Sequence, residues 1–278
     1  GSWSYYDRSL MRTLGADELR ADLRYMDYYG ESGGNDVVPV FSWDFDDTAT
    51  GDLFVWDYSD TRTVPLLSEQ SAEAIHLTLD ESAGQTTVAD ATGNGNSGSV
   101  PSEVTLGVSG QFNTAAEHDG SADTFIEVAN DSTLEPSGEF AFSVWVYPIT
   151  TGQQGVLDML QNYTLFFDRN GNQGFNFATY GDNVTLDTNY SFNQWHHVVV
   201  SWDVGNSVSA WVNNTQVLNS QTYTNTPDTS ANNPLTLFCE ESPGTGNDPL
   251  TGRIDEARIF QSLLDGSDVD SLYNSNSV

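Results

Sequence analysis

The chain contains no lysine, and its 278 residues include a single cysteine, Cys239. One cysteine excludes a disulfide within the chain, and its place in the apolar run 235–239 predicts a small buried side chain. Apolar runs fall far short of the roughly 18 residues that a membrane-spanning helix needs, so we expect no membrane span. Basic residues are also scarce, because eight arginines face 40 Asp and Glu residues, for a formal net charge of −32. Phosphate contacts need a basic footprint, and we therefore expect no binding to nucleic acid.

Acidic residues are spread along the whole chain instead of forming a tail. At molar salt the Debye length falls to about 3 Å, so the mutual repulsion of the carboxylates is screened. An acid excess without lysine therefore indicates a salt-loving source, either a haloarchaeal cell or its virus. An acidic surface that binds cations or basic partners is the alternative. Apolar residues make up 37% of the chain, which is enough to form a folded core.

Residues 1–73 differ from the rest of the chain. The first 30 residues are almost neutral, since they hold four arginines and five acidic residues. Apolar residues recur at helical spacing within 16–29, and extended aromatic runs follow at 37–45 and 53–58. We predict a short helix and a β-hairpin that attach the protein to a second copy of itself, or to other virion or surface proteins. Packing onto the neighbouring domain is the alternative. Aspartates crowd the loop 44–52 and are one candidate cation site, although the EF-hand spacing is absent.

The run 192–212 predicts the centre of an all-β domain. Two segments rich in Val and Trp flank a turn-like tetrapeptide, which indicates two antiparallel strands. Bulky residues alternate on both faces of the first strand, with Trp195 and His197 on one face and His196 on the other. We therefore expect this strand to be covered on both faces. From residue 74 onward, short strand-like runs recur between Gly, Asn, Asp and Ser, which favours a β-sandwich.

Four blocks of this region resemble, in order, those of laminin-G-like, concanavalin A-like jelly-roll domains. They are the segments 76–98 (beginning His-Leu-Thr-Leu-Asp), 140–148 (Phe-Ala-Phe-Ser-Val-Trp-Val-Tyr-Pro), 195–198 (Trp-His-His-Val) and 250–260 (Leu-Thr-Gly-Arg-Ile-Asp-Glu-Ala-Arg-Ile-Phe). The resemblance covers about 74–278 and implies an all-β, two-sheet antiparallel jelly-roll sandwich. It does not cover 1–73. We place one closing helical turn in the tail, at 263–273.

The resemblance also implies a structural calcium ion at the rim of the sandwich, held by loop carboxylates and backbone carbonyls. We predict that Asp119, Asp123 and Asp255 bind this Ca²⁺, which prefers roughly six to eight oxygen ligands. Asp255 has an alternative role, in which it caps backbone donors or pairs with a neighbouring arginine. Asp90 and the asparagines after it form a second candidate, for which turn chemistry is the alternative.

Some relatives with this architecture are glucanases, which need two acids close to one glycosidic bond. Their Glu-x-Asp-x-x-Glu arrangement is absent here, and the adjacent Asp255 and Glu256 would point to opposite faces of a regular strand. The pair 240–241 fails the same test. No Gly-x-Ser-x-Gly motif occurs, and we expect His196 and His197 to be packed or hydrogen-bonded. We therefore predict that the protein is not an enzyme.

Glycan binding uses exposed aromatic rings that stack on sugars, with Asn and Asp side chains that bind hydroxyl groups. We expect more than half of the aromatic candidates in Asn-rich stretches to be core or strand residues; these candidates are Tyr163, Phe175, Phe177, Tyr180, Tyr190 and Tyr223. Sequons for N-glycosylation begin at Asn130, Asn162, Asn183, Asn189 and Asn213. Any sequon that is used would place the protein outside a cell or on a virion.

These observations favour a non-catalytic structural or adhesion protein on the surface of a halophilic virion, such as a turret, spike or tail fibre. Residues 1–73 would attach it, and 74–278 would face a host glycan or S-layer. Its predicted location is therefore extracellular or at the virion surface. A secreted or cell-surface glycan-binding module of a halophilic archaeon is one alternative, and an accessory module of a hydrolase is another.

Overall fold

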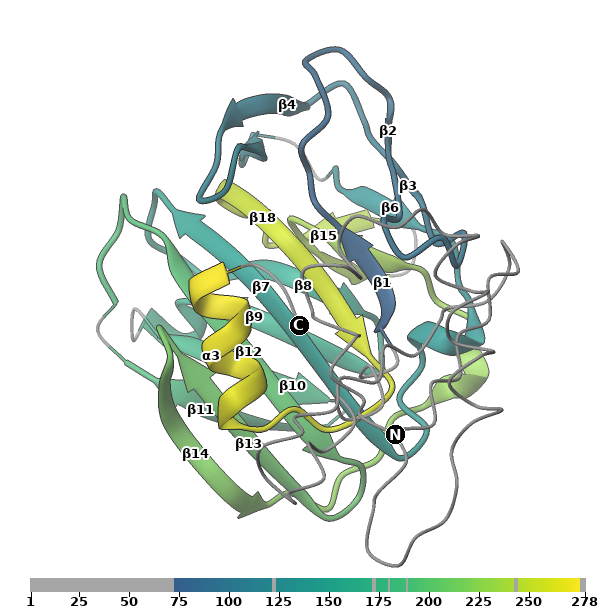
Figure 1. Ribbon diagram of the computed structural model, residues 1–278, viewed down its shortest axis with the longest axis vertical. Helices are drawn as coiled ribbons and strands as arrows, with labels where there is room; N and C mark the ends of the chain where they lie inside the picture. Colours follow the sequence, from purple (N-terminus) through teal and green to yellow (C-terminus); the bar gives the residue numbers. More distant parts are fainter. Residues whose placement is uncertain are drawn as a thin grey trace, which may run out of the picture. The chain divides into compact units, whose positions relative to one another are not determined.

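The computed structural model describes residues 73–121, 124–171, 174–179, 181–188, 190–242 and 245–275. The helix and hairpin expected within 1–73 fall outside these ranges. Most described strands form two antiparallel sheets, and one α-helix lies near the C-terminus (Figure 1). The predicted all-β, two-sheet sandwich is therefore confirmed. No helix in the described ranges is long and apolar enough to cross a membrane.

The first sheet has β7 and β18 as its long central strands. Its order is β14 (Thr215–Thr222), β13 (Ser207–Val212), β12 (His196–Asp203), β7 (Glu139–Pro148), β18 (Thr251–Phe260), β5 (Thr114–Asp119) and β4 (Val104–Ser109), with β1 (Glu73–Leu77) also paired to β18. The expected hairpin of 192–212 is the β12–β13 pair, in which Asp203 lies opposite Ser207. Gly205, between these two strands, has a φ of 77°, a conformation that glycine adopts without strain.

The second sheet packs behind the first. Its order is β11 (Asp182–Asp187), β10 (Phe175–Thr179), β9 (Tyr163–Phe167), β8 (Gln154–Met159), β15 (Leu235–Leu237), β6 (Ile126–Val128), β3 (Gly98–Ser99) and β2 (Thr87–Val88). A small hairpin joins β16 (Glu240–Ser242) to β17 (Thr245–Asn247), and three short 3-10 turns lie at Ser132–Leu134, Arg169–Gly171 and Thr229–Ala231.

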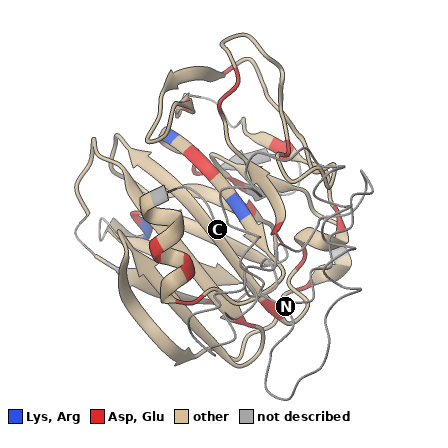
Figure 2. Ribbon diagram, viewed as in Figure 1, with Lys and Arg blue, Asp and Glu red and all other residues tan. Residues whose placement is uncertain are grey.

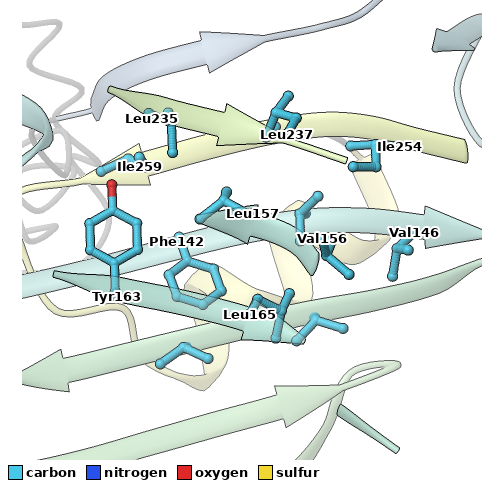
Figure 3. Close-up of a cluster of buried hydrophobic side chains, with 14 of the residues drawn as sticks. Phe142, Val146, Val156, Leu157, Tyr163, Leu165, Leu235, Leu237, Ile254 and Ile259 are labelled. Atoms are coloured by element: carbon cyan, nitrogen blue, oxygen red, sulfur yellow. The ribbon is translucent and has the colours of Figure 1, made fainter. Parts of the chain in front are cut away.

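The main core lies between the two sheets. Alternate residues of β12, such as Val198 and Val200, are fully buried in it, together with Trp202. Figure 3 shows side chains of both sheets meeting there, including Phe142 and Tyr163. Val199 packs on the opposite face of β12, in a second cluster, so the expectation of a strand covered on both faces is confirmed. Cys239 is buried, as predicted.

The helix α3 (Gly266–Ser275) covers part of the outer face of the first sheet (Figure 1). Apolar side chains of the tail pack there against the sheet; the cluster consists of Leu264, Val269 and Leu272 with Ala141, Val199, Trp211 and Phe260. The Oδ1 atom of Asp265 accepts hydrogen bonds from the backbone N–H groups of Ser267 and Asp268 and so caps the helix start. The helix spans ten residues, which is longer than the single turn predicted from the sequence.

A bulge interrupts β18 between Asp255 and Arg258. Glu256 has a φ of 52° there, so the alternation of side chains shifts by one residue and both Asp255 and Arg258 face outward. The Glu256 carboxylate contacts His76 at 2.5 Å and Arg258 at 3.3 Å, which ties β1 to the bulge. Figure 2 shows the basic and acidic residues side by side along β18. The regular alternation expected for Asp255 and Glu256 from the sequence therefore does not hold at this bulge.

Candidate functional site

Four polar and aromatic side chains form a line across the outer face of the first sheet, and we call them the open row: Trp195, Tyr147, Arg253 and Glu117. The sheet register pairs Tyr147 with Arg253, and Arg253 with Glu117. Trp195 directly precedes β12, and its ring meets that of Tyr147 edge-on, with 5.4 Å between ring centroids. The Arg253 guanidinium lies 5.3 Å from the centre of the Tyr147 ring. The strands therefore place an aromatic pair beside a charged pair.

The open row is partly accessible to solvent. Its two aromatic residues are half-buried, and the side chains of Arg253 and Glu117 are 28% and 32% exposed. Arg253 Nε donates to Glu117 Oε2 at 2.5 Å, and its Nη1 donates to the Ser109 carbonyl oxygen at 3.2 Å. Such a partly exposed ion pair contributes about 0–1 kcal/mol to stability, so its main effect is to orient both groups. The row combines hydrogen-bond donors and acceptors with no net charge.

A second line of side chains lies two residues further along the same strands, and we call it the buried polar row: His197, Trp145 and Asp255. The register pairs His197 with Trp145 and Trp145 with Asp255. None of the three is more than 4% exposed. The ring of Trp145 stacks on that of His197 at 4.8 Å, and Tyr273 of α3 stacks on Trp145 at 5.2 Å. Tyr273 of the helix therefore covers part of the buried polar row, and its ring does not extend over the open row.

Asp255 holds the turn between β4 and β5. Its Oδ2 atom accepts hydrogen bonds from the backbone N–H groups of Gln111 and Phe112, at 2.8 and 2.9 Å. Burial raises the pKa of Asp255 to about 7, and the nearby charge of Glu256 adds to this rise, while the two N–H groups oppose it. Asp255 thus has the capping role that the sequence left open as an alternative.

His197 is neutral in this environment. Burial lowers its pKa to about 3, and the positive charge of Arg258 acts in the same direction. Its Nε2 atom lies 2.8 Å from the hydroxyl oxygen of Ser143. A nucleophile–base–acid relay would require an acid on Nδ1, and that atom has no hydrogen-bond partner in the described structure. His196 instead bonds the Ser191 carbonyl oxygen and Asn213.

The structure separates two of the three predicted calcium ligands, Asp119 and Asp255. Asp119 is exposed at the end of β5, where its Oδ1 atom accepts from the backbone N–H of Ser121. It pairs with Thr251, four residues before Asp255, which corresponds to about 13 Å along the strand. Asp123 lies outside the described residues. No cluster of three His, Cys, Asp or Glu that fits a metal ion occurs in the described ranges, and the calcium site stays a prediction.

The second cation candidate, Asp90, is engaged in turn chemistry. Its carboxylate accepts from the backbone N–H groups of His76, Thr92 and Asn96, and from the Thr92 hydroxyl. Partial burial raises the pKa of Asp90, but these hydrogen bonds together outweigh it, so the pKa is lowered from its usual value. Its carboxylate therefore stabilises a turn, which is the alternative that the sequence left open.

Most of the aromatic candidates are core residues. Tyr163, Phe175 and Phe177 are 0% exposed, and Tyr223 is 4% exposed. Such rings have no free face for a sugar to stack on. Tyr190 is partly buried and packs against the core, and Tyr180 lies outside the described residues. The expectation that more than half of these rings are core or strand residues is confirmed.

The sequon asparagines differ in accessibility. Asn183 is exposed, Asn130 and Asn213 are half-buried, and Asn162 is 1% exposed. Asn189 lies outside the described residues. The Asn213 side chain is also engaged with His196 and with the backbone N–H of His197. Among the sequons that the structure describes, Asn183 is therefore the one most open to an attached glycan.

The open row is not evident from the sequence alone. Trp195 and Tyr147 both occur in blocks that carried the family resemblance, and Arg253 and Glu117 face outward by simple alternation. Three of the four lie on strands far apart in the chain, so only the sheet register brings them into one line. One sequence signal could have pointed to the open row: Tyr147 directly precedes Pro148 at the end of a long apolar strand.

A family model for the concanavalin A-like lectin/glucanases superfamily, Laminin_G_3, matches residues 119–270. This match covers more than half of the chain and includes both central strands of the first sheet. The chain belongs to the Laminin_G_3 family. A search of curated proteins found no matching relative.

Solved structures share this fold with the Laminin_G_3 domain. Domain 4 of AbnA, an extracellular arabinanase of Geobacillus stearothermophilus, was solved with arabinotriose; it is 22% identical, with a TM-score of 0.57, and the match covers 74% of this chain and 100% of that one. The binding domain of Paraclostridial Mosquitocidal Protein 1 is 16% identical, with a TM-score of 0.58 and coverage of 74% and 53%. A structure of botulinum neurotoxin type C, whose cell entry depends on two ganglioside molecules, is 14% identical, with a TM-score of 0.57 and coverage of 75% and 52%. The chain thus spans about half the length of these two toxin chains.

Proposed function

We propose that this Laminin_G_3 domain is a non-catalytic glycan-binding module whose ligand lies along the open row. The observation that supports this proposal most directly is that neighbouring strands place four side chains in one line, namely Trp195, Tyr147, Arg253 and Glu117. Aromatic rings offer an apolar face to the C–H side of a sugar, while Arg and Glu supply a donor and an acceptor for its hydroxyl groups.

The charges of the open row favour a neutral glycan. Arg253 is already paired with Glu117 and so offers no uncompensated positive charge to an anionic sugar. The whole chain carries a formal net charge of −32, which also repels anionic ligands. Domain 4 of AbnA, which shares this fold, was solved with arabinotriose, a neutral sugar chain. This likeness supports a neutral glycan as the ligand class.

Binding without hydrolysis is the second part of this proposal. A glycosidase needs two carboxyl groups on either side of one sugar bond. Glu117 is the one acid of the open row, and it is held by Arg253. Asp255 is in the next row and is 0% exposed, with one carboxylate oxygen bound to the turn of Gln111 and Phe112. The geometry of the described residues therefore favours recognition over cleavage.

Glycan binding can be tested with the full chain at molar salt. We expect a glycan array to show binding to neutral oligosaccharides, and arabinotriose is the first probe for calorimetry. Tyr147→Ala and Trp195→Ala should each weaken binding by about tenfold or more, because buried aromatic contacts dominate most recognition sites. Leu263→Ala, at an exposed position away from the row, is the matched control and should bind normally. Equal binding by all three variants would place the site elsewhere.

We further propose that residues 1–73 attach the module to a surface, as a turret, spike or tail-fibre component of a halophilic virion or as a cell-surface module. The near-neutral, aromatic composition of the first 30 residues supports this attachment, because the rest of the chain is strongly acidic. Light scattering at molar salt should show an assembly for the full chain and a monomer for residues 74–278. A monomer in both cases would contradict attachment through self-association of residues 1–73, while the proposed glycan binding would still stand.

A further inference from the structure

The buried polar row contains several buried polar atoms that lack a hydrogen-bond partner. Each of its three side chains carries one buried polar atom without a hydrogen-bond partner: Nδ1 of His197, Nε1 of Trp145 and Oδ1 of Asp255. The side chains are 1%, 4% and 0% exposed, in the same order. Buried polar atoms in proteins nearly always have partners, because losing contact with water without replacement costs free energy. Three such atoms on three neighbouring strands indicate a common occupant.

The remaining atoms of these side chains are already engaged, which limits where the occupant lies. Asp255 Oδ2 accepts from two backbone N–H groups, and His197 Nε2 bonds the Ser143 hydroxyl. Tyr273 stacks on Trp145 from the side of α3, and Phe112 meets the same ring edge-on at 5.9 Å. The free atoms therefore belong to buried side chains on three neighbouring strands, next to the two aromatic rings that pack on Trp145.

The chemistry of the free atoms selects the occupant. An indole N–H only donates, so it disfavours a metal cation next to it, while the Asp255 Oδ1 atom accepts a hydrogen bond when the carboxyl is ionised and donates one when it is protonated. A hydroxyl group satisfies these atoms in either state, since its oxygen accepts from Trp145 and from a protonated Asp255, and its O–H donates to an ionised Asp255 or to the neutral His197. An apolar cavity would stay dry, as expected around the Trp202 Nε1 atom, which is also unpartnered but lies among core side chains.

We propose that the buried polar row is a binding site for a hydroxyl oxygen, held by Trp145 Nε1 together with Asp255 Oδ1, His197 Nδ1 or both. The hydroxyl comes either from a trapped water molecule or from a sugar whose hydroxyl group enters beside Tyr273. The second source rests on the proposed glycan binding, because the open row lies two residues away on the same strands. The first source is independent of it.

Crystals of the full chain, grown without glycan and then soaked in arabinotriose, separate these sources. Density for an oxygen within hydrogen-bond distance of Trp145 Nε1 and of one other free atom is the expected result in both crystals. A spherical peak in both identifies water, and a peak continuous with the sugar in the soaked crystal identifies the ligand. A direct bond between Trp145 and Asp255, or an empty space in both crystals, would overturn the proposal. Failure of sugar to bind anywhere would contradict the proposed function alone.

A solution measurement avoids dependence on crystals. In the full chain labelled with ¹⁵N-tryptophan, we expect a water cross-relaxation peak at the Trp145 indole N–H and none at the Trp202 indole N–H. Trp145→Phe assigns the signal by removing it. Tyr273→Ala removes the ring that stacks on Trp145, so the cross-relaxation peak should weaken as the water exchanges faster. This second variant tests the proposal even if Trp145→Phe does not fold. A Trp145 indole that shows no water contact in the glycan-free protein, together with empty density in both crystals, contradicts both sources.

Discussion

The outer face of the first sheet has two halves that are built on the same strands. Beneath α3, β7 contributes Ala141 and β18 contributes Phe260, and both are 0% exposed in an apolar cluster. At the other end, the same strands contribute Tyr147 and Arg253, which are half-buried. The buried polar row separates the two halves. One half therefore stabilises the fold, while the other leaves aromatic and charged groups available to a ligand.

The outward side chains of a strand, and not the position of that strand in the sheet, determine which part of the outer face α3 covers. Small and apolar side chains at one end allow α3 to pack closely and bury its own Leu264, Val269 and Leu272. Large amphipathic side chains at the other end keep their polar atoms in water. The variants below test this division, from the largest expected effect to the smallest.

Truncation beneath the helix should cost the most stability. Phe260→Ala removes a fully buried ring from the α3 cluster, and we expect it to lower the free energy of unfolding by about 3–5 kcal/mol. Tyr147→Ala, on the neighbouring strand in the open half, should cost about 1 kcal/mol, because its ring is half-buried. Urea unfolding at constant salt, followed by tryptophan fluorescence, measures both. Equal losses would show that the open half is as structural as the covered half.

Between the two halves, Asp255 and His197 should give opposite pH dependences. The pKa of Asp255 is raised to about 7, so the folded state holds a proton that the unfolded chain has lost, and stability from this group falls as the pH rises from about 4 through 7. The pKa of His197 is lowered to about 3, so its contribution is present above about pH 6.5 and is lost as the pH falls toward 3.

Single variants separate these contributions from the titration of the other acids. Unfolding of the unmodified chain and of Asp255→Asn is compared at pH 4 to 8, and we expect the stability difference to shift in favour of the variant as the pH rises. His197→Gln should show the reverse trend, gaining relative to the unmodified chain as the pH falls from 6.5 to 4. A difference that does not change with pH for either variant would contradict the assigned protonation state of that residue.

The smallest effect on stability is expected in the open row. Glu117→Gln weakens the partly exposed ion pair with Arg253 and should change the free energy of unfolding by less than about 1 kcal/mol. The same variant should weaken glycan binding measurably, since the glutamate no longer offers a charged acceptor or fixes the arginine. Calorimetry and urea unfolding on one preparation test the two claims together. A large loss of stability with unchanged binding would assign the pair to the fold instead of the ligand.

Several structural features could be predicted from the sequence because they depend on local pattern. The Val- and Trp-rich run around Val198 and Val200 predicted a strand buried on both faces, and the structure confirms it. The tail's apolar spacing predicted a closing helix, although α3 is longer than one turn. The bulge at Glu256 was not predictable, because the Glu256 carboxylate contacts His76, which comes from another strand, β1, 180 residues earlier in the chain.

The candidate site depended on pairing between distant strands. Trp195 and Tyr147 were visible as aromatic residues in recognisable blocks, yet nothing in the sequence placed Glu117 and Arg253 beside them. The aromatic candidates that the sequence did favour, such as Tyr163, lay in Asn-rich segments and proved to be core residues. Local composition indicates a loop or strand, but it does not determine which face of that strand meets the core.

The sequence by itself determined the fold class, the strand-rich core and the acidic character of this protein, since alternation and composition act locally and do not require knowledge of strand order. Only the tertiary structure decided which outward side chains share a row, which of them α3 covers, and which polar atoms are left without partners. The physical reason is that register joins residues more than a hundred positions apart, so a row across a sheet has no counterpart in the linear chain.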